Sequence, residues 1–469
     1  MEVEATTLLP TFRDPSGSVE IHASCVLRHV YPSAAPAVLE FLELPLAREL
    51  KREGKLVETW VESRAESPSD PAQTLLLRHE RVSFISYPWE WPSALWISAA
   101  ELTLEICERS LPAGRILQDA TPLNVLFRGS RPVFVDVLSF QPIDPANPVW
   151  YAYAQFVRTF LLPMLAYTQL GWPLQATLGC TDGYDPEEIA GSLPWYRKFQ
   201  QPAFSLVTLP ALLSRRKQGR APRPPKFMSQ EPELAMLVIR NTLKTLRCRL
   251  RQVSPSSGES MWSEYTETAA HYSAEDHAGK RTFIRQALAE SAPRHVLDVG
   301  CNTGVYSMLA AEAGAEVVAI DSDMQALSRL AVAAGRSGKS ILPLHVDLAR
   351  PTPAAGWQNQ EAASFLDRCR GHFDTVMMLA VIHHLLLSKQ IPMGQIAALC
   401  DRLTSDNLIV EWVPPQDEMF QELVRGRETL YRGITEEAFR DAFAVYFRIL
   451  RSETLDNGRV LFHMRKPGR

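Results

Sequence analysis

The stretch His295-Val296-Leu297-Asp298-Val299-Gly300-Cys301-Asn302-Thr303-Gly304-Val305-Tyr306-Ser307 decides how the second half of this chain folds. Its first five residues form a short apolar run that predicts a buried strand, and residues 306–313 predict a helix. The glycines fall in the turn between these elements. Glycine is needed there because a ligand can approach a strand-to-helix turn closely where no Cβ intervenes, and the following helix presents unpaired N–H groups.

The turn has the pattern Asp-x-Gly-x-x-x-Gly and differs from the Gly-x-Gly-x-x-Gly of dinucleotide-binding proteins. The carboxylate of Asp298 disfavours a pyrophosphate and suits a ligand that carries an amine and a sulfonium. A second predicted strand, 316–321, ends in Asp321, which can accept hydrogen bonds from ribose hydroxyls. A third, 341–346, is followed by Asp347, placed to accept from an adenine amino group. Three strands that end in acids predict a site for a cationic nucleoside.

On these three motifs, residues 261–469 resemble a class I S-adenosylmethionine (SAM) dependent methyltransferase. The resemblance implies an α/β fold with a Rossmann-like, seven-stranded sheet and SAM as the cofactor. The family usually has a glycine where this chain has Asn302, and asparagine tolerates left-handed dihedrals better than most residues. A Rossmann-like domain that has lost its ligand is the alternative. The cofactor-binding residues that the resemblance implies are Asp298, Gly300, Asn302, Gly304, Asp321, Asp347 and Leu348.

Further strands are expected at 373–381 and 407–413, with 446–451 and 459–464 as a closing antiparallel pair. Ligands lie at the carboxyl ends of such strands, so we expect His383, His384 and Glu411 near the transferred methyl group. A hydroxyl acceptor needs a base, and histidine is the usual choice, although one of the two imidazoles could instead brace the core. The chain lacks the Asn- or Asp-Pro-Pro-aromatic motif that indicates methylation of an amino group on a base or on glutamine, which makes that reaction less expected.

The N-terminal half predicts a small α+β lobe at 1–94, with strands at 19–29 and 82–87, and a mostly helical lobe at 95–252 that begins with a helix at 95–110. Asp119, Asn124, a hairpin and a strand that ends in Asp136 resemble the catalytic loop of kinase-like phosphotransferases. That resemblance implies Asp119 as base and Asn124 and Asp136 as magnesium ligands. A glycine-rich phosphate loop and a Val-Ala-x-Lys strand are missing from the sequence, so a degenerate kinase-like scaffold and an unrelated hairpin remain alternatives.

Composition limits the partners of the chain. The 469 residues, enough for two or three domains, carry a net charge of -4, which gives no global attraction for nucleic acid or anionic lipid. The basic stretch within 215–251 could contact nucleic acid but more often such runs are solvated linkers, and 253–260 is the clearest linker. We expect no metal outside the kinase-like alternative.

Targeting signals are scarce. Seven cysteines without a Cys-x-x-Cys pair fit a reducing compartment, and no secretory signal is visible, so we expect a cytoplasmic protein. The longest apolar stretch, 160–174, is too short to span a bilayer.

As a whole the chain resembles bacterial methyltransferase-like proteins related to a rhizobial nodulation protein, on the block from Asp119 to Asp136, Tyr272, the His383-His384 pair and Glu411. The resemblance implies an enzyme that transfers a methyl group from SAM to an O-nucleophile on a small molecule or glycan-like substrate, which the N-terminal half binds. A phosphotransferase in the N-terminal half and a non-catalytic binding scaffold are the alternatives. The acceptor and the oligomeric state stay open.

Overall fold

The computed structural model describes residues 13–22, 24–63, 75–217, 231–255 and 274–467. Tertiary contacts divide the chain into two compact units. Unit 1 holds residues 1–127, 131–257 and 355–362, and unit 2 holds residues 128–130, 258–354 and 363–469. The division after residue 257 falls inside the stretch 253–260 that we expect to be a linker. Each unit is described by itself.

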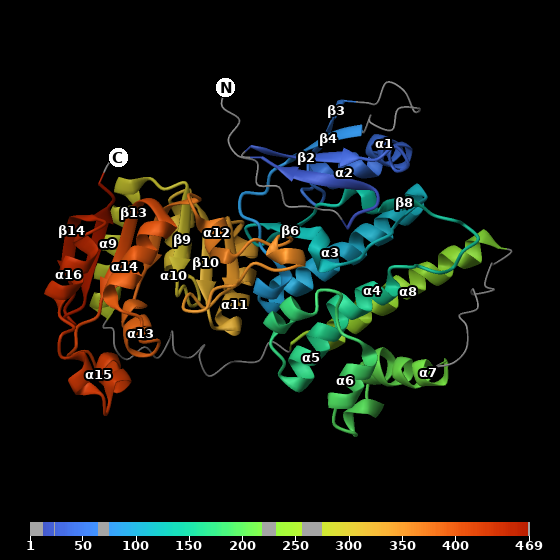
Figure 1. The fold of residues 1–469 in the computed structure, drawn as a ribbon. Coiled ribbons are helices and arrows are strands. Elements are labelled where there is room, and N and C mark those ends of the chain that lie inside the picture. Colours follow the sequence, from blue (N-terminus) through green and yellow to red (C-terminus); the bar gives the residue numbers. More distant parts are fainter. Residues whose placement is uncertain (1–12, 23, 64–74, 218–230, 256–273, 468–469) are drawn as a thin grey trace. The chain divides into compact units, whose positions relative to one another are not determined.

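Unit 2 is built on a seven-stranded sheet in the order β11-β10-β9-β12-β13-β15-β14 (Figure 1). The first five strands in that order run parallel, and β15 runs antiparallel to both β13 and β14. This is the Rossmann-like sheet that the sequence predicts, including the closing antiparallel pair. The strands are β9 (His295–Val299), β10 (Glu316–Asp321), β11 (Ile341–His345), β12 (Phe373–Met378), β13 (Thr404–Trp412), β14 (Arg448–Thr454) and β15 (Val460–Arg465).

Some strand ends differ from the prediction. The strand expected to reach residue 381 ends at Met378, because Ala380 has a positive φ of 55° that extended backbone does not adopt. The strand expected from residue 407 begins at Thr404, where a polar start hides it from a search for apolar runs.

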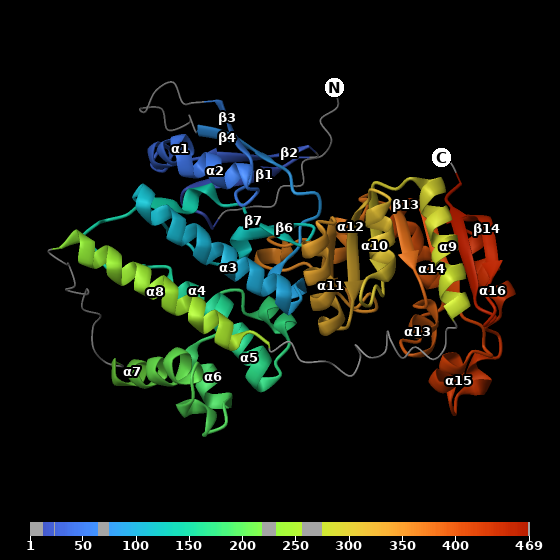
Figure 2. The same cartoon turned by 180° about the vertical axis from the view of Figure 1, so that it is seen from behind.

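Helices cover both faces of this sheet. Figure 1 shows α14 and α16 in front of the strands, and Figure 2 shows α9 over the opposite face. The helices of unit 2 are α9 (Ala274–Ser291), α10 (Val305–Glu312), α11 (Met324–Ser337), α12 (Phe365–Cys369), α13 (Ile382–Leu387), α14 (Met393–Leu403), α15 (Glu418–Val424) and α16 (Glu436–Ala444). The alternation of strand and helix from β9 onward explains the parallel pairing, since each crossover needs a helix to return the chain.

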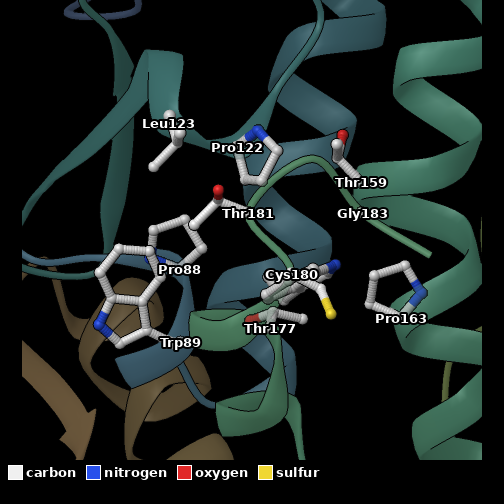
Figure 3. Close-up of a pocket in the computed structure, with 11 residues that line it drawn as sticks. Pro88, Trp89, Pro122, Leu123, Thr159, Pro163, Thr177, Cys180, Thr181 and Gly183 are labelled. Carbon is white, nitrogen blue, oxygen red and sulfur yellow. The ribbon is translucent and has the colours of Figure 1, made fainter. Parts of the chain in front are cut away.

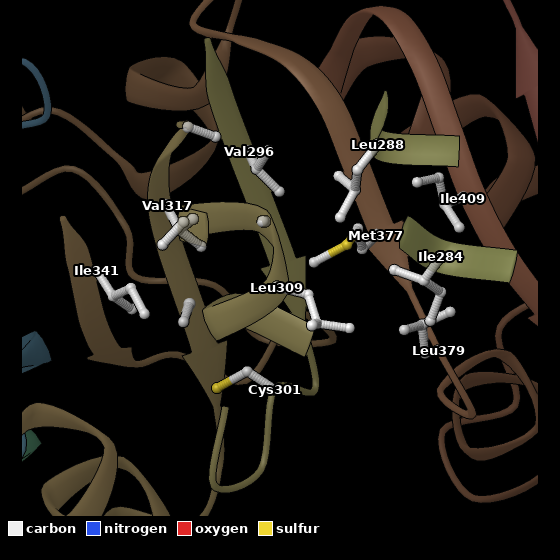
Figure 4. Packing of buried hydrophobic residues seen from close by; sticks show 14 of the residues in the cluster. Ile284, Leu288, Val296, Cys301, Leu309, Val317, Ile341, Met377, Leu379 and Ile409 are labelled. Carbon is white, nitrogen blue, oxygen red and sulfur yellow. The ribbon is translucent and has the colours of Figure 1, made fainter. Parts of the chain in front are cut away.

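The core of unit 2 lies between the strands and helices α9, α10 and α11 (Figure 4). Met377 of β12 lies beside Ile284 and Leu288 of α9, and Val317 of β10 lies toward Ile341 of β11. Burial of one such aliphatic side chain is worth about 1.5–3 kcal/mol, so this layer fixes the sheet edge from which the candidate site projects.

Unit 1 contains a four-stranded antiparallel sheet in the order β1-β2-β4-β3, formed by β1 (Gly17–Ile21), β2 (Cys25–Val30), β3 (Thr59–Ser63) and β4 (Leu75–Glu80). The single strand expected at 19–29 is wrong, because the chain turns after residue 21 and β1 pairs with β2, with Ile21 opposite Val26. The strand expected at 82–87 is also wrong. Val82 and Phe84 are buried, but these residues form a connection, so side-chain burial rather than strand pairing accounts for their apolar pattern.

Helices and short strand pairs complete unit 1. The predicted helix at 95–110 is confirmed as α3 (Ser93–Ser110). The pair β6 (Val125–Arg128) and β7 (Arg131–Phe134) forms the expected hairpin, and β5 (Arg115–Leu117) pairs with β8 (Phe140–Pro142). The other helices are α1 (Ala35–Glu43), α2 (Pro45–Arg52), α4 (Tyr153–Phe156), α5 (Leu162–Leu170), α6 (Pro186–Ser192), α7 (Leu209–Lys217) and α8 (Pro232–Val253).

Candidate active site

The turn between β9 and α10 adopts the conformation that its glycines allow. Gly300, Asn302 and Gly304 have φ values of 69°, 48° and 81°. The N–H groups of Gly300 and Cys301 donate to the carbonyl of Ile320 at 2.8 and 3.1 Å, which holds the turn against β10. Asparagine at 302 thus fills a left-handed position at which the methyltransferase family usually has glycine. Its side-chain oxygen is buried and has no hydrogen-bond partner, so the turn offers a free acceptor to a ligand.

Asp298 is buried beneath this turn, at the fourth position of β9. The hydroxyl of Ser307 donates to its carboxylate at 2.5 Å. Burial, opposed in part by that hydrogen bond and aided by the charge of Asp321, raises the pKa of Asp298 to about 7. A cationic amine would lower this pKa again, so the carboxyl is suited to a positively charged ligand.

Asp321 ends β10 and binds the turn directly. One carboxylate oxygen accepts from the N–H of Asn302 at 2.8 Å, and the other accepts from the N–H of Asp323 at 2.9 Å. Each oxygen keeps a second lone pair for another donor. The side chain is therefore fixed by two backbone donors and can still accept from two adjacent hydroxyls.

Asp347 follows β11 and is already paired. Lys389 donates to its carboxylate at 3.0 Å and Arg350 at 3.3 Å. Burial alone would raise the pKa of Asp347, but these cations and the N–H of Ala349 lower it below its usual value. Leu348, next in the chain, is buried. The pairing means that an adenine amino group would share Asp347 with Lys389.

The two histidines occupy different environments at the start of α13. His383 is 3% exposed, its Nδ1 has no hydrogen-bond partner, and burial together with the charges of His384, Arg459 and Lys280 lowers its pKa to about 2. His384 is exposed, and its ring centroid lies 4.2 Å from that of His383. Its pKa is lowered by desolvation and by Arg459, and raised in part by Asp321. Both imidazoles are therefore neutral at ordinary pH, and His384 is the one that solvent reaches.

Glu411 lies in a buried network of charges. Lys280 of α9 donates to one of its oxygens at 2.5 Å, and Arg459 lies 3.5 Å from the other. Arg459 also donates to Asp417 at 2.8 Å. The Nζ of Lys280 lies 4.9 Å from the ring centroid of Tyr306, which follows the glycine turn in sequence. Two cations therefore compensate the buried carboxylate of Glu411.

The residues present fit the sulfonium nucleoside that the sequence suggests. Acids lie at or just beyond the ends of β9, β10 and β11, beside a glycine turn and a free buried acceptor on Asn302. Sequence reasoning did not assign Lys280 and Arg459 to the site. They lie 131 and 48 residues from Glu411, and sequence spacing carries no signal for such pairings.

A second group of polar residues gathers in unit 1. Asp136 accepts from Arg28 of β2 at 3.0 Å and from the hydroxyl of Ser139 at 2.6 Å, and Asn124 donates to that hydroxyl at 3.4 Å. Asp119 accepts from Gln155 at 3.3 Å. The structure thus brings Asn124 and Asp136 together through Ser139.

The charges in this group are partly compensated. Burial, together with the charges of Asp136 and Asp14, raises the pKa of Asp119. Sequence reasoning missed Arg28, whose guanidinium binds the Asp136 carboxylate that was expected to be a magnesium ligand. Arg28 bonds one oxygen of Asp136 and the hydroxyl of Ser139 bonds the other, so a magnesium ion would share this carboxylate with both groups.

A small pocket opens beside the loop that carries Asp119 (Figure 3). Pro122 and Leu123 of that loop face Pro88 and Trp89 across it, and Thr181 directs its hydroxyl between them. Its lining is mostly apolar, and Leu123 is 46% exposed. A cavity of this kind suits the apolar face of a small ligand.

Several predicted features fall outside these two sites. Tyr272 lies outside the described residues. In the basic stretch within 215–251, Arg247 pairs with Glu108 at 2.8 Å, and residues 218–230 are not described. Among the described residues, no cluster of three or more histidine, cysteine or acidic side chains is arranged for a metal ion. Within the same part of the chain, every helix is too short or too polar to cross a bilayer.

Comparison with known proteins supports a methyltransferase domain in unit 2. A family model described as a methyltransferase domain matches residues 270–421. The chain is 31% identical over 451 residues to the nodulation protein NoeA of Rhizobium meliloti (strain 1021), with 94% of this chain and 92% of that protein covered.

Solved structures are more distant. The magnesium protoporphyrin IX methyltransferase of Synechocystis PCC 6803 with bound S-adenosylhomocysteine (SAH) is 17% identical, with a TM-score of 0.30, and the match covers 49% of this chain and 99% of that one. The N-methyltransferase NodS of Bradyrhizobium japonicum WM9 is 14% identical, with a TM-score of 0.30, and the match covers 42% of this chain and 98% of that one.

Proposed function

This chain belongs to the family of the nodulation protein NoeA and is a SAM-dependent methyltransferase, and we propose that its methyl acceptor is a hydroxyl group on a small molecule or glycan-like substrate. The neutral, adjacent imidazoles of His383 and His384 support an oxygen acceptor, because a hydroxyl must lose a proton as it attacks. An amino-group methyltransferase of the Asn-Pro-Pro-aromatic type would carry that motif after β12, where this chain has Leu-Ala-Val-Ile-His-His at 379–384.

In this proposal the cofactor lies along the carboxyl ends of β9, β10 and β11. Asp298 and the turn residues Gly300, Asn302 and Gly304 hold the methionine end, with the free side-chain oxygen of Asn302 as one acceptor. Asp321 accepts from the ribose hydroxyls. Asp347 and Leu348 border the adenine. The cofactor, when bound, supplies an electrophilic methyl group on a sulfonium.

The proposed division of labour between the histidines follows from their burial. His384 is exposed and takes the proton of the acceptor hydroxyl to solvent. His383 is buried and neutral, so it offers its free Nδ1 as a hydrogen-bond partner that orients the acceptor. Glu411, held by Lys280 and Arg459, fixes the wall beside them. In-line displacement at a methyl group depends mainly on such alignment and on exclusion of water.

Unit 1 is proposed to bind the acceptor. The cavity beside Pro122 and Trp89 is apolar and small, and its open side carries hydroxyls such as that of Thr181. An apolar wall with few polar groups is what binds one face of a sugar ring or an aromatic ring.

The test is transfer of labelled methyl from SAM to matched acceptors. We would compare bacterial glycans with their counterparts in which the free hydroxyls are blocked, and simple amines of similar size. The proposal expects label on the free hydroxyls, retained after mild base, and a large loss of rate in His384→Gln with SAH affinity unchanged. Label on amines, or full activity in His384→Gln, would contradict it.

A second candidate function, phosphoryl transfer in unit 1, has one observation in its favour. The side chains of Asn124 and Asp136 both contact the hydroxyl of Ser139, so they lie close to one another, as two ligands of one magnesium ion would. Magnesium-dependent ATP turnover that disappears in Asp136→Ala and persists in Glu108→Ala would support it. Absence of nucleotide binding would end it, and absence of binding to both ATP and SAH would favour a non-catalytic scaffold.

A further inference from the structure

We propose that one face of unit 1 docks on a membrane rich in anionic phospholipid. This docking face combines an aromatic turn with helix α7, which follows the turn in the sequence. Its residues are Trp195, Tyr196, Phe199, Leu209, Leu212 and Leu213. This inference concerns a surface that the methyltransferase reaction and its proposed acceptor do not use.

The docking face exposes large apolar side chains to an unusual degree. Trp195 is 77% exposed and Phe199 is 71% exposed, and Leu212 of α7 is 53% exposed. Single exposed apolar residues are common, but a contiguous apolar patch marks an interaction site. Water contact with these rings and leucines is unfavourable, so a partner that covers them gains hydrophobic free energy.

The aromatic turn and α7, which carry the six residues, are neighbours in the fold. The hydroxyl of Thr208, the residue just before α7, donates to the carbonyl of Lys198 at 2.7 Å, which joins the aromatic turn to the helix. Leu209, Leu212 and Leu213 follow the spacing i, i+3 and i+4, which places them on one side of α7. Figure 1 shows α6 and α7 side by side, with the turn that links α6 to α7 beside them.

Charge identifies the partner. From residue 189 to residue 230 the sequence has no acidic residue and eight basic ones, whereas the whole chain has a net charge of -4. The basic residues are Arg197, Lys198, Arg215, Arg216, Lys217, Arg220, Arg223 and Lys226. Arg197 and Lys198 belong to the turn of the docking face, and Arg215, Arg216 and Lys217 end α7. Basic residues beside an apolar face favour an anionic surface, and each contributes about 1 kcal/mol near anionic lipid.

The combination of rings, leucines and basic residues selects a bilayer over other anionic partners. Tryptophan and tyrosine are enriched where hydrocarbon meets headgroups, and a leucine stripe on a basic helix inserts into that boundary. RNA would match the charge but would leave the leucines of α7 in water. A second copy of the chain would bring two basic segments together, which like-charge repulsion opposes.

The test is flotation of the full chain with vesicles. One set contains phosphatidylcholine alone and the other contains phosphatidylcholine mixed with phosphatidylglycerol. We expect binding to the anionic vesicles and a fall in binding as salt rises. The double variant Trp195→Ala/Phe199→Ala should bind at least about tenfold more weakly, and Arg215→Gln about fivefold more weakly, in line with the contribution of one basic residue.

Trp357→Ala is the matched control, because Trp357 is 61% exposed and lies outside the docking face. Its vesicle binding should equal that of the unmodified chain, and all variants should keep the same melting temperature and SAH affinity. No binding to anionic vesicles, unchanged binding of the double variant, or binding to RNA in place of vesicles would overturn the proposal. A dimer that dissociates in the double variant, without a change in vesicle binding, would overturn it as well.

Discussion

Replacement of Asp321 by alanine should remove most of the affinity for the cofactor while the fold survives. Both carboxylate oxygens of Asp321 already accept from backbone N–H groups, of Asn302 and Asp323, and each has capacity for one ribose hydroxyl. Hydrogen bonds to a charged acceptor are worth about 1.5–3 kcal/mol each. Loss of two such bonds amounts to about 3 kcal/mol or more, which lowers affinity on the order of 100-fold.

The assay is calorimetric titration of the purified chain with SAH. Asp323→Ala is the matched control, since this neighbouring carboxylate accepts from Gln325 and Ala326 as the N-terminal cap of α11. It should lose about 1 kcal/mol of stability but keep its affinity for SAH within a few-fold. If a folded Asp321→Ala chain binds SAH as tightly as the unmodified one, the assignment of the ribose site is refuted.

Three further predictions concern the stability of unit 2. Gly304→Ala should unfold at a clearly lower denaturant concentration than Gly314→Ala. Both glycines have a positive φ, but a Cβ at residue 304 would lie 2.2 Å from a leucine side chain of α11, whereas a Cβ at residue 314 would have no atom within 4 Å. Lys280→Met should lower the free energy of unfolding in urea by about 3 kcal/mol, because the buried carboxylate of Glu411 loses one of its cations. The double variant Lys280→Met/Glu411→Leu should recover much of that stability. A double variant as unstable as Lys280→Met alone would contradict this explanation. Because the pKa of Asp298 is raised to about 7, the folded state holds a proton that the unfolded state releases near pH 4. Without cofactor, the stability of the chain should therefore fall as pH rises from about 4 to about 7. Thermal melts at a series of pH values should show this slope in the unmodified chain but not in Asp298→Asn.

The sequence was sufficient to predict the parallel strands of unit 2 because most of them contain a continuous apolar run next to turn residues. Strand β9, for example, has four buried residues in succession and is followed by Gly300. Local sequence is enough to locate β9, and it is also enough to place Asp321 at the end of β10. Strand ends were predicted less well, since Ala380 has a positive φ that no residue preference announces.

Pairings across the chain could not be predicted. Arg28 and Asp136 lie 108 residues apart, and Lys280 and Glu411 lie 131 apart, so tertiary folding alone brings them together. The His383-His384 pair was recognised in sequence, but adjacent helical residues face different directions, and which one is buried depends on how α13 packs.

The row of acids at the ends of β9, β10 and β11 has a consequence for turnover. A sulfonium carries one positive charge and a thioether carries none, so each reaction removes a positive charge from an edge that carries three acidic residues. The electrostatic attraction that draws the cofactor in is therefore weaker for the product that must leave, which keeps the amine but has lost the sulfonium charge. We expect added salt to weaken binding of SAM more than binding of SAH, so that the chemistry itself promotes release of the product.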